Sequence, residues 1–254
     1  MTGPERAIRL IRAGFPEPPA RDTAVSNAIL RRVSEGLEPE TLRLHRPGDI
    51  VAFGPKDRLA PGYGRAIREA AELGFGSVQR LAGGRAAVFT DRTIAFSWAV
   101  PDLSPRPGIR ARFEEVAAIM AGAFRNLGVD ARVGEVPGEY CPGEHSVNAR
   151  GRTKLMGVGQ RLLQRAAHVG GVIVVGGTGR VRDVLIPVYR ALGLTWDPAT
   201  TGSLEDEVPG LTWDRALQAV VDAFAARYRL EESKLPAETL DLANSLEAGH
   251  AAEA

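Results

Sequence analysis

Cys141 has the clearest chemical potential, because it is the sole cysteine of the 254-residue chain and lies in the polar stretch EYCPGEHSVNARGRTK. No apolar periodicity surrounds it, and the Pro-Gly that follows predicts a turn, so we expect the thiol at the edge of a loop. A thiolate is a strong nucleophile, and a nearby cation lowers the pKa of a thiol. Lone cysteines are also often buried and inert, so the local sequence leaves both interpretations open.

Lys154 is the candidate cation for this thiol. It opens the strand-like segment KLMGVGQ, in which Gly157 and Gly159 leave the backbone open to close approach by a ligand. A lysine beside such a bare strip could contact a carbonyl group, whereas an ordinary edge-strand lysine would serve to discourage aggregation. His145 is an alternative base, or an exposed loop residue. The four histidines and one cysteine show no ligand spacing typical of a metal site, so no metal is expected.

A second glycine strip lies in RLAGGRAAVF, residues 80–89. Gly83 and Gly84 interrupt an otherwise strand-like segment and would weaken it unless something approaches its backbone. Flanking alanines would line the strip with methyl groups, and such a slot suits a slender apolar chain such as a fatty acyl tail. A bulge at a sheet corner is the alternative interpretation.

The segment VIVVGGTGRVRD, residues 172–183, runs from a strand through glycines into a helix, as dinucleotide-binding folds begin. However, Arg182 occupies the place of the third glycine. The acidic residue expected about twenty positions later could only be Asp197, and no apolar strand precedes it. We therefore favour an ordinary strand-to-helix turn.

Composition excludes several classes of protein. The 32 basic and 31 acidic residues nearly cancel, which argues against a nucleic-acid binder. No apolar run approaches the roughly 20 residues that span a bilayer, so no membrane association is expected. One cysteine cannot form an intrachain disulfide, which fits a reducing, cytoplasmic location.

The elements that must position these residues follow from hydrophobic periodicity and turn signals. Apolar spacing predicts helices over 22–36, 63–73, 108–127, 181–192 and 213–228. Strands are predicted in TLRLHRPGDIVAFGP, SVQRLAGGRAAVFT, TIAFSWAV, DARVGEV and HVGGVIVV, with a hairpin turning at 149–151. This mixture indicates an α/β (α+β) protein with a central mixed or antiparallel sheet flanked by helices. We expect an N-terminal arm over 1–21, a catalytic domain over 22–232 and a disordered tail over 233–254.

Three segments, taken in order, resemble lipoate–protein ligases and octanoyltransferases. RLAGGRAAVFTDRTIAFSWAVP resembles their Arg-x-x-Gly-Gly-x-Ala-Val strand pair. RTKLMGVGQRLLQRAAHVGGVIVV resembles their Gly-x-Lys-x-x-Gly-x-x-Gln-Arg strand and the His-x-Gly strand after it. EYCPGEHSVNARGRTK resembles the cysteine-bearing loop of the octanoyltransferase and amidotransferase branch. Leu81, Ala82 and Gly159 depart from the family pattern within the acyl slot, so these departures concern the choice of acyl donor and not the reaction class.

The resemblance implies a fold shared with biotin ligases and acyl transfer to a lysine of a lipoyl-carrier domain, that is, protein lipoylation. It implies that Cys141 is the nucleophile, which takes the acyl group as a thioester, and that Lys154 holds the acyl carbonyl. It further implies that the acyl slot is lined by Arg80, Gly83, Gly84, Gly157 and His168.

The same resemblance implies partners and alternatives. The acyl donor would be acyl carrier protein or an acylated glycine-cleavage protein, and the acceptors would be lipoyl domains of 2-oxoacid dehydrogenases. A thioester is already activated, so the transferase needs no cofactor. The alternative is an ATP-dependent lipoate–protein ligase, which forms lipoyl-adenylate with ATP and Mg²⁺ and needs no cysteine. A further alternative is a non-catalytic acyl-carrier-binding or dinucleotide-binding protein. Octanoyl versus lipoyl specificity and the oligomeric state stay open.

Overall fold

The computed structural model of the protein describes residues 6–253. Its strands are β1 (Ala7–Ile11), β2 (Thr41–His45), β3 (Ile50–Phe53), β4 (Gly76–Gln79), β5 (Ala87–Phe89), β6 (Thr93–Pro101), β7 (Ala131–Val133), β8 (Val147–Ala149), β9 (Thr153–Leu162), β10 (Ala166–Val174) and β11 (Arg229–Glu232). Its helices are α1 (Arg21–Ser34), α2 (Tyr63–Glu72), α3 (Ile109–Asn126), α4 (Thr178–Ala191), α5 (Leu204–Glu207), α6 (Trp213–Ala225) and α7 (Ala237–Leu246), with 3₁₀ turns η1 (Pro198–Thr200) and η2 (Glu247–His250).

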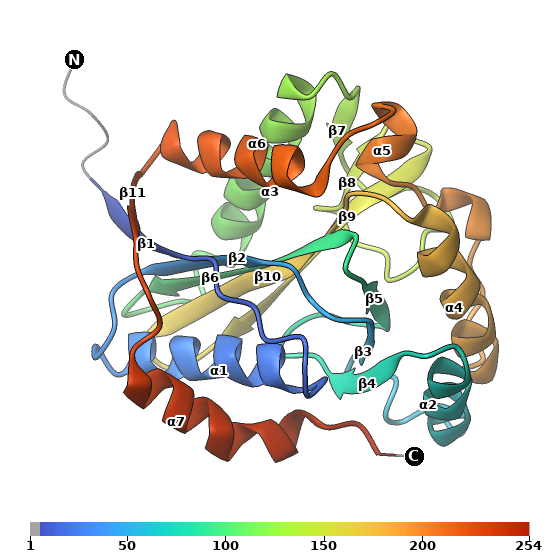
Figure 1. Ribbon diagram of the computed structural model, residues 1–254, viewed down its shortest axis with the longest axis horizontal. Coiled ribbons are helices and arrows are strands. Elements are labelled where there is room, and N and C mark those ends of the chain that lie inside the picture. Colours follow the sequence, from blue (N-terminus) through green and yellow to red (C-terminus); the bar gives the residue numbers. More distant parts are fainter. Residues whose placement is uncertain (1–5, 254) are drawn as a thin grey trace.

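The strands form two sheets. The large mixed sheet has the order β11-β1-β2-β6-β10-β9-β8-β7, and the small one has the order β4-β3-β5. Helices α3 and α6 cover one face of the large sheet, α1 covers the other with α7 packed on its outer side, and α2 and α4 flank the small sheet (Figure 1). The expected α/β architecture with a mixed sheet flanked by helices is therefore confirmed.

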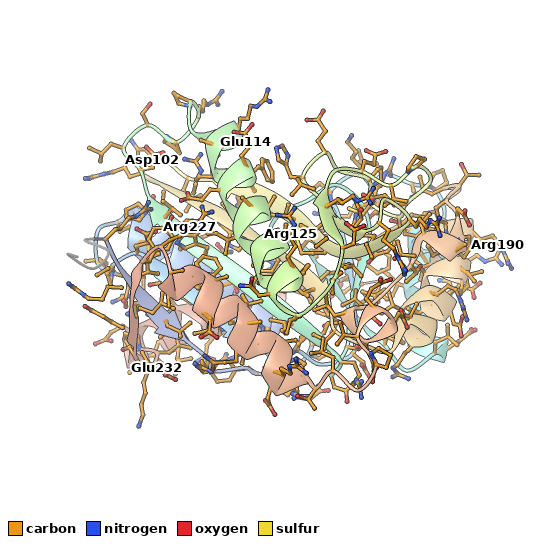
Figure 2. The ribbon with its side chains drawn as sticks, turned by 90° about the horizontal axis from the view of Figure 1, so that it is seen from above. Asp102, Glu114, Arg125, Arg190, Arg227 and Glu232 are labelled. Carbon is orange, nitrogen blue, oxygen red and sulfur yellow. The ribbon has the colours of Figure 1, made fainter. Side chains whose placement is uncertain are left out.

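The main core lies between the large sheet and the helices α3 and α6, which run across the sheet in Figure 2 with Glu114 and Arg125 on α3. Val116, Met120 and Phe124 recur every four residues along α3 and are fully buried, so they form the apolar stripe that packs on the sheet. Trp98 on β6 meets Phe224 of α6 edge to face, with ring centroids 5.7 Å apart. The predicted helices and the 149–151 hairpin are confirmed.

The segment 76–89, predicted as one strand, is two strands joined by a loop over residues 80–86. Strands β4 and β5 both pair with β3, on opposite sides of it. The continuous-strand prediction is wrong because Gly83 adopts φ +108, a conformation that breaks a strand and that glycine accepts readily. The turns at 46–49 and 90–92 carry the chain from one sheet to the other.

Both expected terminal extensions are wrong as far as the structure describes them. Residues 7–11 form β1, which lies between β2 and β11 in the large sheet, whereas residues 1–5 lie outside the described part. Segment 233–253 is ordered, because Ala243 and several leucines of α7 pack on the apolar face of α1. The Ala252 N–H donates to the carbonyl of Ser77 at 3.2 Å, which ties the end of the chain to β4. None of the helices described here combines the length and hydropathy needed to cross a bilayer.

Candidate active site

Cys141 lies in the loop between β7 and β8, in a conformation that non-glycine residues rarely adopt, with φ +43. Its N–H donates to the hydroxyl of Tyr189 on α4 at 2.9 Å, and that hydroxyl donates to the carbonyl of Ala86 at 2.9 Å. Tyr189 thus joins the cysteine loop to the 80–86 loop. Backbone strain of this kind persists where the surroundings hold it, and it is common at active sites.

Arg80 is the cation that touches the thiol. Its backbone N–H donates to the carbonyl of Phe53 at 2.9 Å, which fixes the residue at the end of β4. The guanidinium Nη1 donates to the Sγ of Cys141 at 3.3 Å and to the carbonyl of Arg85 at 2.7 Å. Burial opposes ionisation of the thiol, but the charges of Arg80 and Lys154 and hydrogen bonds from Arg80 and the Arg85 backbone prevail. The pKa of Cys141 is therefore lowered from its ordinary value.

Lys154 lies near the thiol but is committed to the loop backbone. Its ammonium donates to Glu139 Oε1 at 2.9 Å, to the Tyr140 carbonyl at 3.0 Å and to the Cys141 carbonyl at 2.7 Å. An ammonium has three N–H donors, so all of them are used inside the loop. In this arrangement Lys154 positions the cysteine and adds positive charge, and it has no donor left for an acyl carbonyl.

The Lys154–Glu139 pair is buried, with side-chain exposures of 2% and 0%. Glu139 also accepts from the Ser146 hydroxyl and from the Val136 and Gly143 N–H groups. Removing one partner of a buried pair leaves an unpaired charge, so Lys154→Met is expected to lower the free energy of unfolding by about 3–5 kcal/mol.

Urea denaturation measures this effect. Because the double variant Lys154→Met/Glu139→Gln carries no orphaned charge, it should lose less stability than the sum of the two single variants. Additive losses would contradict a direct pairing.

Gly159 on β9 allows the 80–86 loop to lie on the large sheet. A Cβ there would come within 2.8 Å of the Gly83 backbone, so no side chain fits. The strip predicted to receive a ligand is thus covered at this point by main chain. Gly84 packs against Gly54, because a Cβ added to Gly54 would collide with the Gly84 carbonyl. Gly157 packs beside the Lys154 side chain.

Gly159→Val should therefore push the loop and its Arg80 away from the thiol. We expect the pH midpoint for iodoacetamide alkylation of the single cysteine to move to higher pH, because the thiolate loses a cationic neighbour. Gly122→Ala in α3 is the matched control, since a Cβ there meets no atom within 4 Å. An unchanged midpoint in Gly159→Val would show that the loop contact does not hold Arg80.

A cavity of about 80 Å³ lies between α1, β3 and the large sheet. Phe96, Gly170 and Gly171 form its wall on β6 and β10, and Arg80 and His168 also line it. His168 Nδ1 lies 3.2 Å from the Ser97 hydroxyl. Burial lowers the pKa of His168 to about 3, helped by the charges of Arg161 and Arg80, so the ring is neutral at physiological pH. Arg80 both borders this cavity and contacts Sγ, whereas Cys141 itself is not among the lining residues.

The structure brings together part of the predicted set. Arg80 contacts the Cys141 thiol, and Lys154 contacts the Cys141 carbonyl. Arg80 and His168 border the cavity, but the predicted slot glycines do not line it; they are Gly83, Gly84 and Gly157. His145 stacks on the Phe113 ring at 5.0 Å, and no hydrogen bond links it to the thiol within the described residues. These placements leave the catalytic roles as proposals.

The glycine turn before α4 is a structural turn, as the sequence favoured. Gly177 adopts φ +74 as the N-cap of α4. A Cβ on Gly176 would meet the side chains of Arg92 and Glu205, which pair at 2.7 Å across the turn. This ion pair fills the space beside the turn.

Sequence reasoning missed the roles of Tyr189 and Glu139 and placed Arg80 only in the acyl slot. Tyr189 follows the helical apolar pattern and gives no signal of its own, whereas Glu139 could have been noticed as an acidic residue directly before the cysteine loop.

Comparisons with known proteins find a family model, curated relatives and solved structures that are similar to this chain. The family model of the lipoyl protein ligase A/B catalytic domain matches residues 18–225. An octanoyl-GcvH:protein N-octanoyltransferase of Exiguobacterium sp. is 28% identical over 170 residues, which cover 62% of this chain and 59% of the relative. Octanoyltransferase LipM of Moorella thermoacetica is 30% identical over 138 residues, covering 51% of this chain and 47% of the relative. The chain thus spans about half to three fifths of the length of these curated relatives.

Solved structures show the same fold. A putative lipoate protein ligase from T. acidophilum, with bound lipoic acid, has a TM-score of 0.75 at 19% identity, covering 95% of each chain. Lipoate-protein ligase A bound with ATP has a TM-score of 0.73 at 20% identity, covering 94% of each chain. At these identities the likeness establishes the fold.

Proposed function

Since the chain belongs to the lipoyl protein ligase A/B catalytic-domain family, we propose that it transfers an octanoyl or lipoyl group to a lysine of a lipoyl-carrier domain through a thioester at Cys141. The main support for this proposal is the single thiol. Its Sγ lies 3.3 Å from the Arg80 guanidinium, and its pKa is lowered. The names of the curated relatives support octanoyl as the acyl group.

In the first half-reaction the Cys141 thiolate attacks the acyl carbon of the donor. A bond forms between Sγ and that carbon, the bond to the donor's leaving atom breaks, and the leaving group takes up a proton. Arg80 stabilises the attacking thiolate. A guanidinium has five N–H donors, and Nη1 makes the contacts to Sγ and to the Arg85 carbonyl. Its other N–H groups are available to the oxygen that becomes negative in the transition state.

In the second half-reaction the neutral amine of the carrier lysine attacks the thioester. The new amide bond forms, the bond to Sγ breaks, and the amine loses a proton. Arg80 now stabilises the departing thiolate, so the residue that activates the nucleophile also assists its release. Lys154 acts as a positioning residue, because its three hydrogen bonds hold the backbone around Cys141.

The cavity beside Arg80 is the proposed acyl slot. Its wall of Phe96, Gly170 and Gly171 offers an apolar ring and bare main chain to an acyl chain, and His168 is neutral. The charged groups among the lining residues are Asp22 and Arg80. We propose acyl carrier protein or octanoylated GcvH as donor and lipoyl domains as acceptors. No cofactor is required on this route, since no step needs ATP.

Intact-mass spectrometry tests the proposal. Incubation with an octanoyl donor in the absence of ATP should add one octanoyl group to the protein, removable by hydroxylamine, and addition of a lipoyl domain should discharge it. Acyl transfer that strictly requires ATP and leaves no adduct would reject the proposal in favour of the ligase.

A further inference from the structure

A second cavity, of about 300 Å³, shares Arg80 with the acyl cavity. Its walls carry four arginines: Arg31 on α1, Arg58 after β3, Arg80 after β4 and Arg161 on β9. Gly249 and His250 close one side of it. We call this set of four arginines the arginine pocket.

The arginine pocket has no acidic partner in its own lining, as far as the structure describes the chain. Within residues 6–253 none of its four guanidiniums forms an ion pair, and no acidic residue lines the cavity. Arg58 donates to the Gln79 amide oxygen at 3.0 Å, and Arg80 donates to Sγ and to a carbonyl. The nearby carboxylate of Asp57 is taken by Arg85 at 3.3 Å and by the Gly54 N–H at 2.8 Å.

Two histidines lie close enough to these arginines to feel their charge. Burial lowers the pKa of His250, the hydrogen bond to the Gln79 carbonyl opposes this, and the charges of Arg161 and Arg31 lower the pKa further. The charges of Arg161 and Arg80 act on His168 in the same direction. Like charges gathered around a concave site repel one another, and a bound anion relieves that repulsion.

We propose that the arginine pocket binds the phosphate group of a small molecule and that Arg80 couples its occupancy to the state of the Cys141 thiol. The planar guanidinium group donates paired hydrogen bonds to phosphate oxygens. A doubly charged phosphate neutralises more of the charge of several arginines than a single carboxylate does. A cavity of about 300 Å³ admits a small ligand and excludes a folded domain. The phosphate belongs either to a phosphorylated arm, ending in a thiol, that carries the acyl group of the donor, or to a free phosphorylated molecule.

The coupling follows from the shared guanidinium. A phosphate in the pocket attracts Arg80 and offsets its charge, so the thiolate loses stabilisation and the thiol becomes harder to ionise. The other titratable groups around the thiol do not line the pocket; they are Lys154 of β9, Glu139 and Tyr140 of the cysteine loop, and Tyr189 of α4. Phosphate binding itself does not depend on the proposed acyl transfer.

Calorimetric titration of the full chain with inorganic phosphate tests the site. We expect saturable binding at one site. The variant Arg31→Gln/Arg161→Gln should bind at least about tenfold more weakly, because it loses two charge-assisted hydrogen bonds. Both arginines are exposed and unpaired in the described chain, so folding should be unaffected. The matched control is Arg227→Gln, after α6 on the opposite face of the sheet (Figure 2), which should bind as the parent does.

Alkylation of the single cysteine tests the coupling. Saturating phosphate should move the pH midpoint of alkylation upward in the parent and in Arg227→Gln, but not in the double variant; chloride at equal ionic strength controls for screening. Tighter binding of 4′-phosphopantetheine than of inorganic phosphate or pantetheine would identify the thiol arm. Equal binding of the two phosphates would identify a free phosphorylated molecule.

Absence of phosphate binding, or undiminished binding in the double variant, would overturn the inference. So would binding of an acidic peptide in place of phosphate. A chain that binds phosphate yet forms no thioester would retain this inference and lose the proposed function.

Discussion

Cys141→Ser is expected to abolish acyl transfer, with a loss of about four to six orders of magnitude in rate, as for removal of other covalent nucleophiles. The hydroxyl keeps the size of the side chain, but it is not ionised near neutral pH, and the field of Arg80 and Lys154 cannot compensate for that. Transfer of octanoyl from a purified donor to a lipoyl domain measures the rate, and intact mass measures the missing adduct.

The serine variant must be shown to be folded. Urea midpoints close to those of the parent provide this control, since the hydroxyl nearly fills the place of the sulfur beside the apolar cluster that Cys141 contacts. Cys141→Gly adds a second check: φ +43 is relaxed in glycine, so this variant should be inactive but at least as stable as Cys141→Ala. Substantial transfer by Cys141→Ser would contradict the thioester route, and ATP dependence of that activity would point to the ligase.

Arg80→Gln should give the second-largest effect, a loss of about 10²–10³ in transfer rate, comparable to removal of one oxyanion-stabilising donor. Arg80 lowers the pKa of the thiol, so its removal raises that pKa. Below the thiol pKa the thiolate fraction falls about tenfold per pH unit, so the loss is greatest at and below neutral pH. The alkylation profile of Cys141 should accordingly shift to higher pH.

Two comparisons separate activation of the thiol from stabilisation of the transition state. At alkaline pH the alkylation rate of Arg80→Gln should recover fully, whereas acyl transfer should recover in part, because the oxyanion still lacks its donor. Arg190→Gln is the matched control and should leave both profiles unchanged, because the Arg190 side chain is exposed at the end of α4 (Figure 2). If Arg80→Gln also leaves the alkylation midpoint unchanged, another group governs the thiol.

The local pattern of apolar and turn-forming residues was sufficient to predict most helices and strands and the candidate nucleophile. The helix over 109–126 follows from apolar residues four apart, and its end follows from Gly128. The hairpin between β8 and β9 follows from Arg150-Gly151, both in the left-handed region. The position of Cys141 in a loop follows from the Pro-Gly after it. Each of these depends on interactions between neighbours in the chain, which a sequence displays directly.

Tertiary structure alone decided which cation meets the thiol. Arg80 and Cys141 are 61 positions apart, and they touch because β4 ends beside the cysteine loop. The ammonium of Lys154 is consumed by Glu139 and two carbonyls, a consequence of burial that its place on a glycine-rich strand does not reveal. The order of segment 233–253 likewise depends on the face of α1 that receives α7. Contacts between distant segments set the electrostatic field at a site, and periodicity within one segment carries no information about them.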